Sequence, residues 1–153
     1  MLSWWDRRSA YARPTVAAGQ YHSVFVDEGG RMLTCGTGLG CSTTDEVTLE
    51  VPTPSPSLAG IRVHAVAAGE HHTLLLTASD GVFSFGDGQN GELGHGDRDA
   101  QIAPRPIDAL RGMRVAAVAV GWFHSVVLLA DGDERTLTFG HGGRSRDSTP
   151  SLL

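Results

Sequence analysis

The chain has 153 residues, a net charge of −5 and 20 glycines. Glycine is present at about twice its usual share of ~7%, and seven prolines accompany it without a G-X-Y period, which excludes collagen. So many turn-forming residues argue against a helix bundle and favour β structure.

Charge and hydropathy limit the partners of the chain. All 12 basic residues are arginines, and they do not gather in one cluster, so a nucleic-acid-binding surface is not expected. No apolar run approaches the ~20 residues that a membrane-spanning helix needs, so a membrane is not expected as a partner either.

Residues 1–15 precede the repeated part of the chain. They contain arginines but no apolar core, so they do not have the pattern of a secretory signal. We therefore expect a cytoplasmic or nuclear protein. Residues 1–15 are either a leader or the remnant of a preceding repeat, and the role of Trp4 and Trp5 stays open.

The two cysteines give no sign of a metal site or of a disulfide framework. Cys35 and Cys41 are six residues apart, a spacing that matches no zinc-ligand pattern, and nothing downstream completes one. We expect two ordinary thiols in a reducing compartment, with no metal and no cofactor.

An internal repeat is the main signal in the sequence. VAAGQYHSVFV begins at Val16, VAAGEHHTLLL at Val66 and VAVGWFHSVVL at Val118, at intervals of 50 and 52 residues. Each segment reads V-A-x-G-x-x-H-[ST], continues into an apolar run, turns, and ends a second run at G-x-G. The repeats are 16–65, with a degenerate second half; 66–117, nearly intact; and 118–153, truncated and ending in a tail.

Each repeat predicts three or four short strands. In the second repeat, the first strand ends at the glycine of V-A-x-G, a residue that can adopt a positive φ. Residues 72–77 form a continuous apolar strand that we expect to be buried on both faces. After the Asp80-Gly81 turn, a strand ends at Gly86, a glycine-rich loop follows, and Pro104–Pro106 lead to the next repeat. Several strands in about 50 residues is the period of a β-propeller blade.

The motif resembles the regulator of chromosome condensation (RCC) repeat. Residues 66–96 carry the pattern nearly intact, in VAAGEHHTLLL and SDGVFSFGDGQNGELGHG, and the resemblance covers residues 16–143. It implies an all-β fold, a partial β-propeller of about three blades with three to four antiparallel strands each. A complete propeller of this family usually has about seven blades.

Residues that recur in the motif are expected to be structural. A histidine and a small hydroxyl after a tight turn can satisfy backbone groups, and the three histidines lie on different blades, so we expect no catalytic or metal site from them. The structural set is Gly19, His22, Gly36, Gly69, His72, Gly81, Gly86, Gly91, Gly94, Gly121, His124 and Gly140.

The two variable residues inside G-x-x-H are the candidate binding residues. The same turn recurs in every blade, so these pairs are expected side by side at one end of the propeller, where side chains can vary without disturbing the blades. Trp122 is of the kind that anchors protein interfaces, although packing on a neighbouring blade is the alternative. The candidates are Gln20, Tyr21, Glu70, His71, Trp122 and Phe123.

These features predict a non-catalytic protein–protein interaction module with a regulatory role. The resemblance implies two alternatives: part of a guanine-nucleotide exchange factor for a small GTPase, or an accessory propeller of a larger ubiquitin ligase or signalling protein. No long inserted hairpin that would act as an exchange wedge is apparent. Three blades are also expected to leave open edges that recruit a second copy of the chain.

Overall fold

The computed structural model describes residues 15–41, 47–79, 81–130, 132, 135–142 and 146–152, so Trp4, Trp5 and Asp80 lie outside the described residues. The described residues form three antiparallel sheets of four strands, in which strands adjacent in the chain pair with one another. The first sheet holds β1 (Val16–Ala18), β2 (His22–Val26), β3 (Met32–Thr37) and β4 (Thr48–Pro54). The second holds β5 (Val63–Ala68), β6 (His72–Thr77), β7 (Val82–Gly86) and β8 (Gln101–Pro106). The third holds β9 (Val115–Val120), β10 (His124–Leu129), β11 (Thr136–His141) and β12 (Arg146–Leu152).

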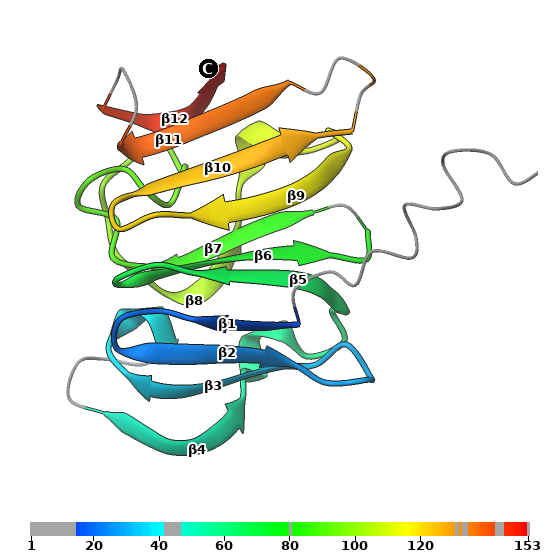
Figure 1. Ribbon diagram of the computed structural model, residues 1–153, viewed down its shortest axis with the longest axis vertical. Helices are drawn as coiled ribbons and strands as arrows, with labels where there is room; N and C mark the ends of the chain where they lie inside the picture. Colours follow the sequence, from blue (N-terminus) through cyan, green and yellow to red (C-terminus); the bar gives the residue numbers. More distant parts are fainter. Residues whose placement is uncertain are drawn as a thin grey trace, which may run out of the picture.

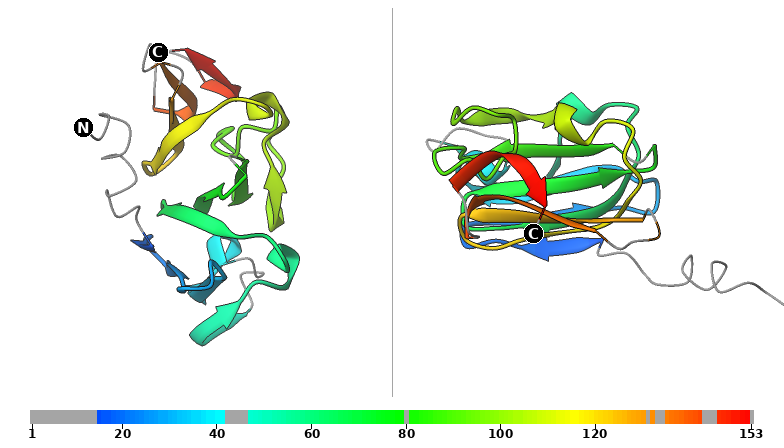
Figure 2. Two further views of the ribbon diagram at one scale, coloured as in Figure 1. Left: turned by 90° about the vertical axis from the view of Figure 1, so that its right-hand side faces the viewer. Right: turned by 90° about the horizontal axis from the view of Figure 1, so that it is seen from above.

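The three sheets stand side by side as blades around an arc (Figures 1 and 2). Strands β1, β5 and β9 lie next to one another on the inner side, and β4, β8 and β12 lie on the outer side. Short 3-10 helices, Pro56–Leu58 and Asp108–Leu110, connect each outer strand to the next inner strand. The expected all-β fold, a partial propeller of three blades, is confirmed with four strands in every blade.

The hydrophobic core lies between the blades, so the middle blade is covered on both sides. Every residue of β6 (His72–Thr77) is buried, as its continuous apolar sequence predicted. Leu75 belongs to the cluster shared with Val24 of the first blade, whereas Leu74 belongs to the cluster shared with Val127 of the third. The alternating side chains of one strand therefore join three blades into one body.

The glycine that begins G-x-G lies at the open end of the hairpin formed by the second and third strands. Gly86 has φ +118° and lies opposite His72 in the register of β6 and β7. A Cβ at Gly86 would collide with the backbone of His71 and His72. The equivalent glycines, Gly36 and Gly140, also have positive φ, +113° and +91°.

The glycine of V-A-x-G has a role that does not depend on a positive φ. Glycine can adopt a positive φ, but Gly69 does not have one. A Cβ added at Gly69 would lie 2.6 Å from the carbonyl oxygen of Gly121 on the next blade, and 2.6 Å from the ring of His72. Glycine is therefore required here because the inner strands of adjacent blades approach closely.

Two of the outer strands, β8 and β12, include residues that were not expected to form strands. Pro104–Pro106, expected to be a connection, belong to β8, and the third repeat, expected to be truncated with a tail, ends in β12. β12 pairs with β11 although its residues do not follow the motif. Proline is tolerated at the outer edge of a sheet, because no further strand needs its missing N–H.

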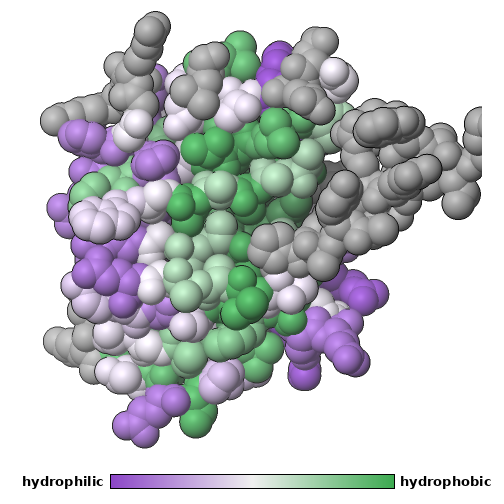
Figure 3. Space-filling model, viewed as in Figure 1, coloured by the Kyte–Doolittle hydropathy of each residue, from purple (hydrophilic) through white to green (hydrophobic). Residues whose placement is uncertain are grey.

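Apolar side chains gather across the middle of the inner face, over β1, β5 and β9 (Figure 3). More polar side chains gather beside them, at the end where the first and second strands of each blade meet (Figure 3). That end of the propeller carries the six candidate binding residues.

Candidate protein-binding end of the propeller

Three equivalent turns lie at the left end of the propeller in Figure 1, where the first strand of each blade leads into the second. In the middle blade the N–H of Gly69 donates a 2.8 Å hydrogen bond to the carbonyl of His72. The same bond joins Gly19 to His22, at 2.8 Å, and Gly121 to His124, at 2.9 Å. Because the backbone is the same in each turn, the two residues between the glycine and the histidine occupy equivalent positions.

The turn histidines hold adjacent blades together behind this end. Nε2 of His22 lies 2.7 Å from Oγ1 of Thr73 on the next blade, and that hydroxyl donates to the carbonyl of Gly40 at 3.0 Å. With its own proton used in this way, the Thr73 hydroxyl accepts from the Nε2–H of His22. The pair His72 and Ser125 repeats the arrangement at 3.0 Å, and Ser125 Oγ donates to the carbonyl of Glu92 at 2.7 Å.

Burial keeps these two rings neutral. Loss of contact with water lowers the pKa of His22 to about 4 and that of His72 to about 3. A neutral imidazole with its proton on Nε2 is the form that the hydroxyl acceptors require. The geometry gives both histidines a structural contact between blades.

The partners of the histidines were not identified from the sequence, which led us to expect only local backbone contacts. The signal was nevertheless present, because a hydroxyl residue follows each turn histidine: Ser23, Thr73 and Ser125. Which group each of these hydroxyls contacts depends on how the blades pack. The hydroxyl of one blade meets the histidine of the preceding blade, about 50 residues away along the chain.

The six candidate binding residues form contacts with one another at the surface. The rings of Tyr21 and His71, from adjacent blades, stack with their centres 5.0 Å apart and their planes at 20°. Nε2 of Gln20 donates to the hydroxyl of Tyr21 at 2.9 Å. Trp122 and Phe123 meet edge to face, with ring centres 6.4 Å apart. The aromatic side chains therefore form two pairs, one across the first and second blades and one within the turn of the third blade.

Trp122 is the most exposed of these aromatic residues. It retains 72% of its accessible surface, against 46% for Tyr21 and 37% for Phe123. An exposed tryptophan on a fixed turn has the properties of an interface anchor.

A shallow hollow of about 330 Å³ opens between the three turns. Its rim is formed by the first variable residue of each turn, namely Gln20, Glu70 and Trp122. Its floor consists of small residues of the inner strands and the turn glycines: Ala18, Gly19, Ala68, Gly69, Val120 and Gly121. The second variable residues, Tyr21, His71 and Phe123, do not line it.

The described residues contain no cluster of three or more side chains that could hold a metal ion. Cys35 and Cys41 are both free, and burial raises the pKa of the Cys41 thiol to about 11. Within the described part of the chain, no helix is long and apolar enough to cross a membrane.

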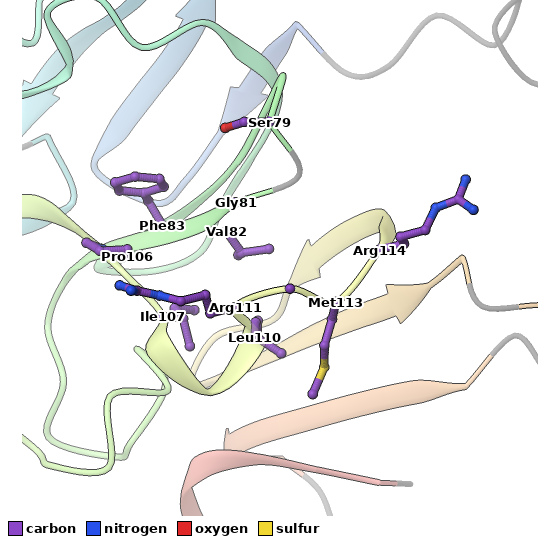
Figure 4. A pocket seen from close by; sticks show the side chains of 11 residues that line it. Ser79, Gly81, Val82, Phe83, Pro106, Ile107, Leu110, Arg111, Met113 and Arg114 are labelled. Carbon is purple, nitrogen blue, oxygen red and sulfur yellow. The ribbon is translucent and has the colours of Figure 1, made fainter.

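A larger hollow, of about 470 Å³, lies at the opposite end of the blades (Figure 4). The side chains of Val82, Ile107 and Leu110 line it, between the turn that follows β6 and the connection to β9. None of the six candidate binding residues reaches it. Its apolar lining continues the core that fills the space between the second and third blades.

Three four-stranded antiparallel blades, arranged around an arc with their first strands innermost, define the chain as part of a β-propeller. Residues 79–128 match a family model described as the regulator of chromosome condensation (RCC1) repeat, and residues 63–92 match a second model with the same description. Residues 63–128 therefore match RCC1 repeat models, in agreement with the resemblance of the repeated motif.

Similar proteins extend this assignment over most of the chain. RCC1 domain-containing protein 1 of Mus musculus is 46% identical over 87 residues, which are 57% of this chain and 23% of that protein. The E3 ubiquitin-protein ligase HERC2 of Homo sapiens is 35% identical over 140 residues, 88% of this chain and 3% of the ligase. A crystal structure of Prp20p from Saccharomyces cerevisiae, described with its binding properties to Gsp1p and histones, has a TM-score of 0.75 at 22% identity, covering 90% of this chain and 37% of Prp20p.

The chain therefore spans well under half the length of each of these proteins. The likeness to Prp20p concerns the fold alone.

Proposed function

We propose that the chain is a non-catalytic protein–protein interaction module, with the three-turn end as its binding surface. The observation that carries this proposal is the placement of different side chains on one repeated backbone turn. The turns are held by the same Gly–His hydrogen bond, while the exposed residues change from Gln20 and Tyr21 to Trp122 and Phe123. A rigid scaffold with variable surface residues is a common form of binding surface.

The relatives support a protein partner. Prp20p is described with binding to Gsp1p and histones, and HERC2 is a ubiquitin-protein ligase in which the matched segment is 3% of the chain. We propose that this module likewise binds another protein, and that it does so in the cytoplasm or the nucleus. Any catalytic activity would then belong to other segments or to the partners. An accessory propeller of a larger ligase is one form of this proposal.

The test is a comparison of bound proteins between wild type and variants of the turn end. Immobilised wild-type chain, Trp122→Ala and Phe123→Ala are incubated with the same extract, and bound proteins are quantified by mass spectrometry. We expect a set of proteins that the wild type retains and both variants lose at least fivefold, since an exposed aromatic anchor contributes about 1–2 kcal/mol or more to binding. Val51→Ala, an exposed apolar position on the outer strand β4, is the matched control.

If wild type, Trp122→Ala and Phe123→Ala retain the same proteins in equal amounts, the three-turn end is not the binding surface. Thermal unfolding of each variant accompanies the experiment, so that a loss of binding is separated from a loss of fold.

Guanine-nucleotide exchange is the second candidate function, because Prp20p, which has the same fold, is described with binding to Gsp1p. It is tested by release of labelled nucleotide from a panel of small GTPases. Accelerated release by the wild-type chain, lost in Trp122→Ala, would favour exchange over simple binding. Release at the rate of the GTPase alone across the panel would exclude it for this chain.

We also propose that the chain associates with a second copy of itself through the faces of its end blades. His22 and His72 each reach a hydroxyl on the next blade, whereas in the described part of the chain no following blade offers a hydroxyl to His124. Ser23 occupies the complementary position on the first blade, where no preceding blade is described. The two end faces are thus complementary in kind, and a second copy can supply the missing partner to each.

A further inference from the structure

We propose that the hollow at the turn end binds an arginine side chain of the partner protein, between the carboxylate of Glu70 and the indole of Trp122. The inference rests on the proposed function and deepens it by naming the chemistry that the partner presents. Gln20, Glu70 and Trp122 occupy the same position in three different blades, and the propeller brings them around one hollow.

The carboxylate of Glu70 lacks the hydrogen-bond donors that a buried acidic group needs. Its Oε1 lies 3.6 Å from Nε2 of His71, beyond hydrogen-bond length, and its Oε2 is buried without a partner among the described residues. The side chain retains 17% of its accessible surface, and it lines the hollow. Because the last torsion of a glutamate side chain is soft, the carboxylate can turn to present an oxygen to a donor that enters. A donor that enters the hollow therefore relieves an unsatisfied group.

The indole of Trp122 provides a second attraction for a cation. Trp122 lines the same hollow and is 72% exposed, and its neighbour Phe123 meets it at an interplanar angle of 85°. A ring in that orientation does not cover both faces of the indole, so one face stays open for a charged group. Cations are attracted to the face of tryptophan more strongly than to that of other aromatic residues.

The remainder of the hollow fits the aliphatic part of an arginine. Its floor is formed by Ala18, Ala68, Val120 and the turn glycines, and none of the nine lining residues is an arginine that would repel a cation. A planar guanidinium can stack on the indole while it donates two hydrogen bonds to the carboxylate. A lysine ammonium can satisfy only one of these contacts well at a time, so arginine is the better occupant. The net charge of the chain, −5, also favours association with a basic partner.

The experiment titrates the full chain with a blocked glycine–serine peptide that carries one arginine. Binding is monitored by NMR, from the indole N–H signals of the tryptophans. The indole signal that is missing from the spectrum of Trp122→Ala is that of Trp122, which lines the hollow. Two further peptides replace the arginine by lysine or by citrulline, which has the shape of arginine without its charge. We expect the Trp122 signal to move with the arginine peptide and to move several-fold less with the lysine peptide at equal concentration. We expect it to stay in place with the citrulline peptide.

Glu70→Gln is the decisive variant, since it removes the charge with little change of shape. The turn accepts an amide here, because Gln20 occupies the equivalent position in the first blade. We expect about tenfold weaker binding of the arginine peptide, the loss that follows from removing a charged hydrogen-bond partner. Val51→Ala is expected to bind like the wild type.

An unmoved Trp122 signal, an equal shift with citrulline, or unchanged affinity in Glu70→Gln would each overturn the arginine site. When one of these results is found but Trp122→Ala still loses its partner proteins in the binding comparison, the arginine site fails while the proposed function stands. If partner proteins are retained by Trp122→Ala as well, the proposed function fails with it.

Discussion

The imidazole of His22 and the hydroxyl of Thr73 join the first blade to the second, with Nε2 and Oγ1 2.7 Å apart. His72 and Ser125 make the same contact between the second blade and the third, at 3.0 Å. In both cases the hydroxyl also donates to a loop carbonyl, of Gly40 or of Glu92. One three-part hydrogen-bonded unit thus recurs at each junction between blades and fixes the turns that carry the candidate binding residues.

His72→Ala tests the contribution of this unit to stability. The substitution removes a fully buried ring and leaves the Ser125 hydroxyl without its donor. We expect a loss of about 3 kcal/mol in the free energy of unfolding, measured by urea denaturation. The neighbouring His71→Ala, at a half-buried position of the same turn, is the control and is expected to cost less than about 1 kcal/mol, the loss of its stacking on Tyr21. Equal losses in the two variants would contradict a role for the blade contact.

Stability is expected to fall as the pH drops from neutral to mildly acidic. The folded pKa values of His22 and His72, about 4 and about 3, lie below the unfolded value of 6.5, so the unfolded chain takes up protons first. Each histidine therefore costs about 2 kcal/mol of stability between pH 7 and pH 5. Above about pH 7.5 the unfolded imidazole is neutral as well, and its contribution is constant.

The measurement compares the pH dependence of wild type with that of His72→Gln. Glutamine keeps a hydrogen-bond donor near Ser125 but does not titrate, so the variant is expected to lose the part of the pH dependence that His72 contributes. Glu92, whose pKa burial raises, acts in the opposite direction, but it is present in both proteins and cancels in the difference. Parallel curves for the two proteins would refute this assignment.

Gly69→Ala tests the close approach of the inner strands. A Cβ at this position would lie 2.6 Å from Gly121 O, so the second and third blades must separate. We expect a loss of about 2–3 kcal/mol in stability. The control is Gly60→Ala, where a Cβ meets nothing within 4 Å and only the positive φ of +81° is unfavourable. That change is expected to cost about 1 kcal/mol. If Gly60→Ala loses more stability than Gly69→Ala, the close approach of the inner strands is not what requires glycine at position 69.

Self-association through the end blades is tested by light scattering coupled to size-exclusion chromatography. We expect the purified chain to form dimers or larger species that dissociate on dilution, because the face that carries His124 meets the face that carries Ser23. Ser23→Arg, which places a bulky charge at that face, is expected to shift the distribution toward monomer. A monodisperse wild-type monomer at high concentration would disprove the association.

Much of the fold followed from the sequence because a propeller repeats its local signals. The V-A-x-G-x-x-H-[ST] motif located the turn at the start of each second strand, and the unbroken apolar run of residues 72–77 predicted a strand buried on both faces. The outer strands β4, β8 and β12 were less apparent. Their sequences differ from blade to blade, because they are held by backbone pairing to one neighbour rather than by shared side-chain packing.

The sequence by itself determined the number of blades, the repeated turn and the six residues that occupy it, because these depend on local spacing. Only the tertiary structure decided which residues meet across blades. The contact of His22 with Thr73, the stacking of Tyr21 on His71 and the hollow between Glu70 and Trp122 each join residues about 50 positions apart. Such contacts are set by the distance and angle between neighbouring sheets, which no local pattern in the chain records.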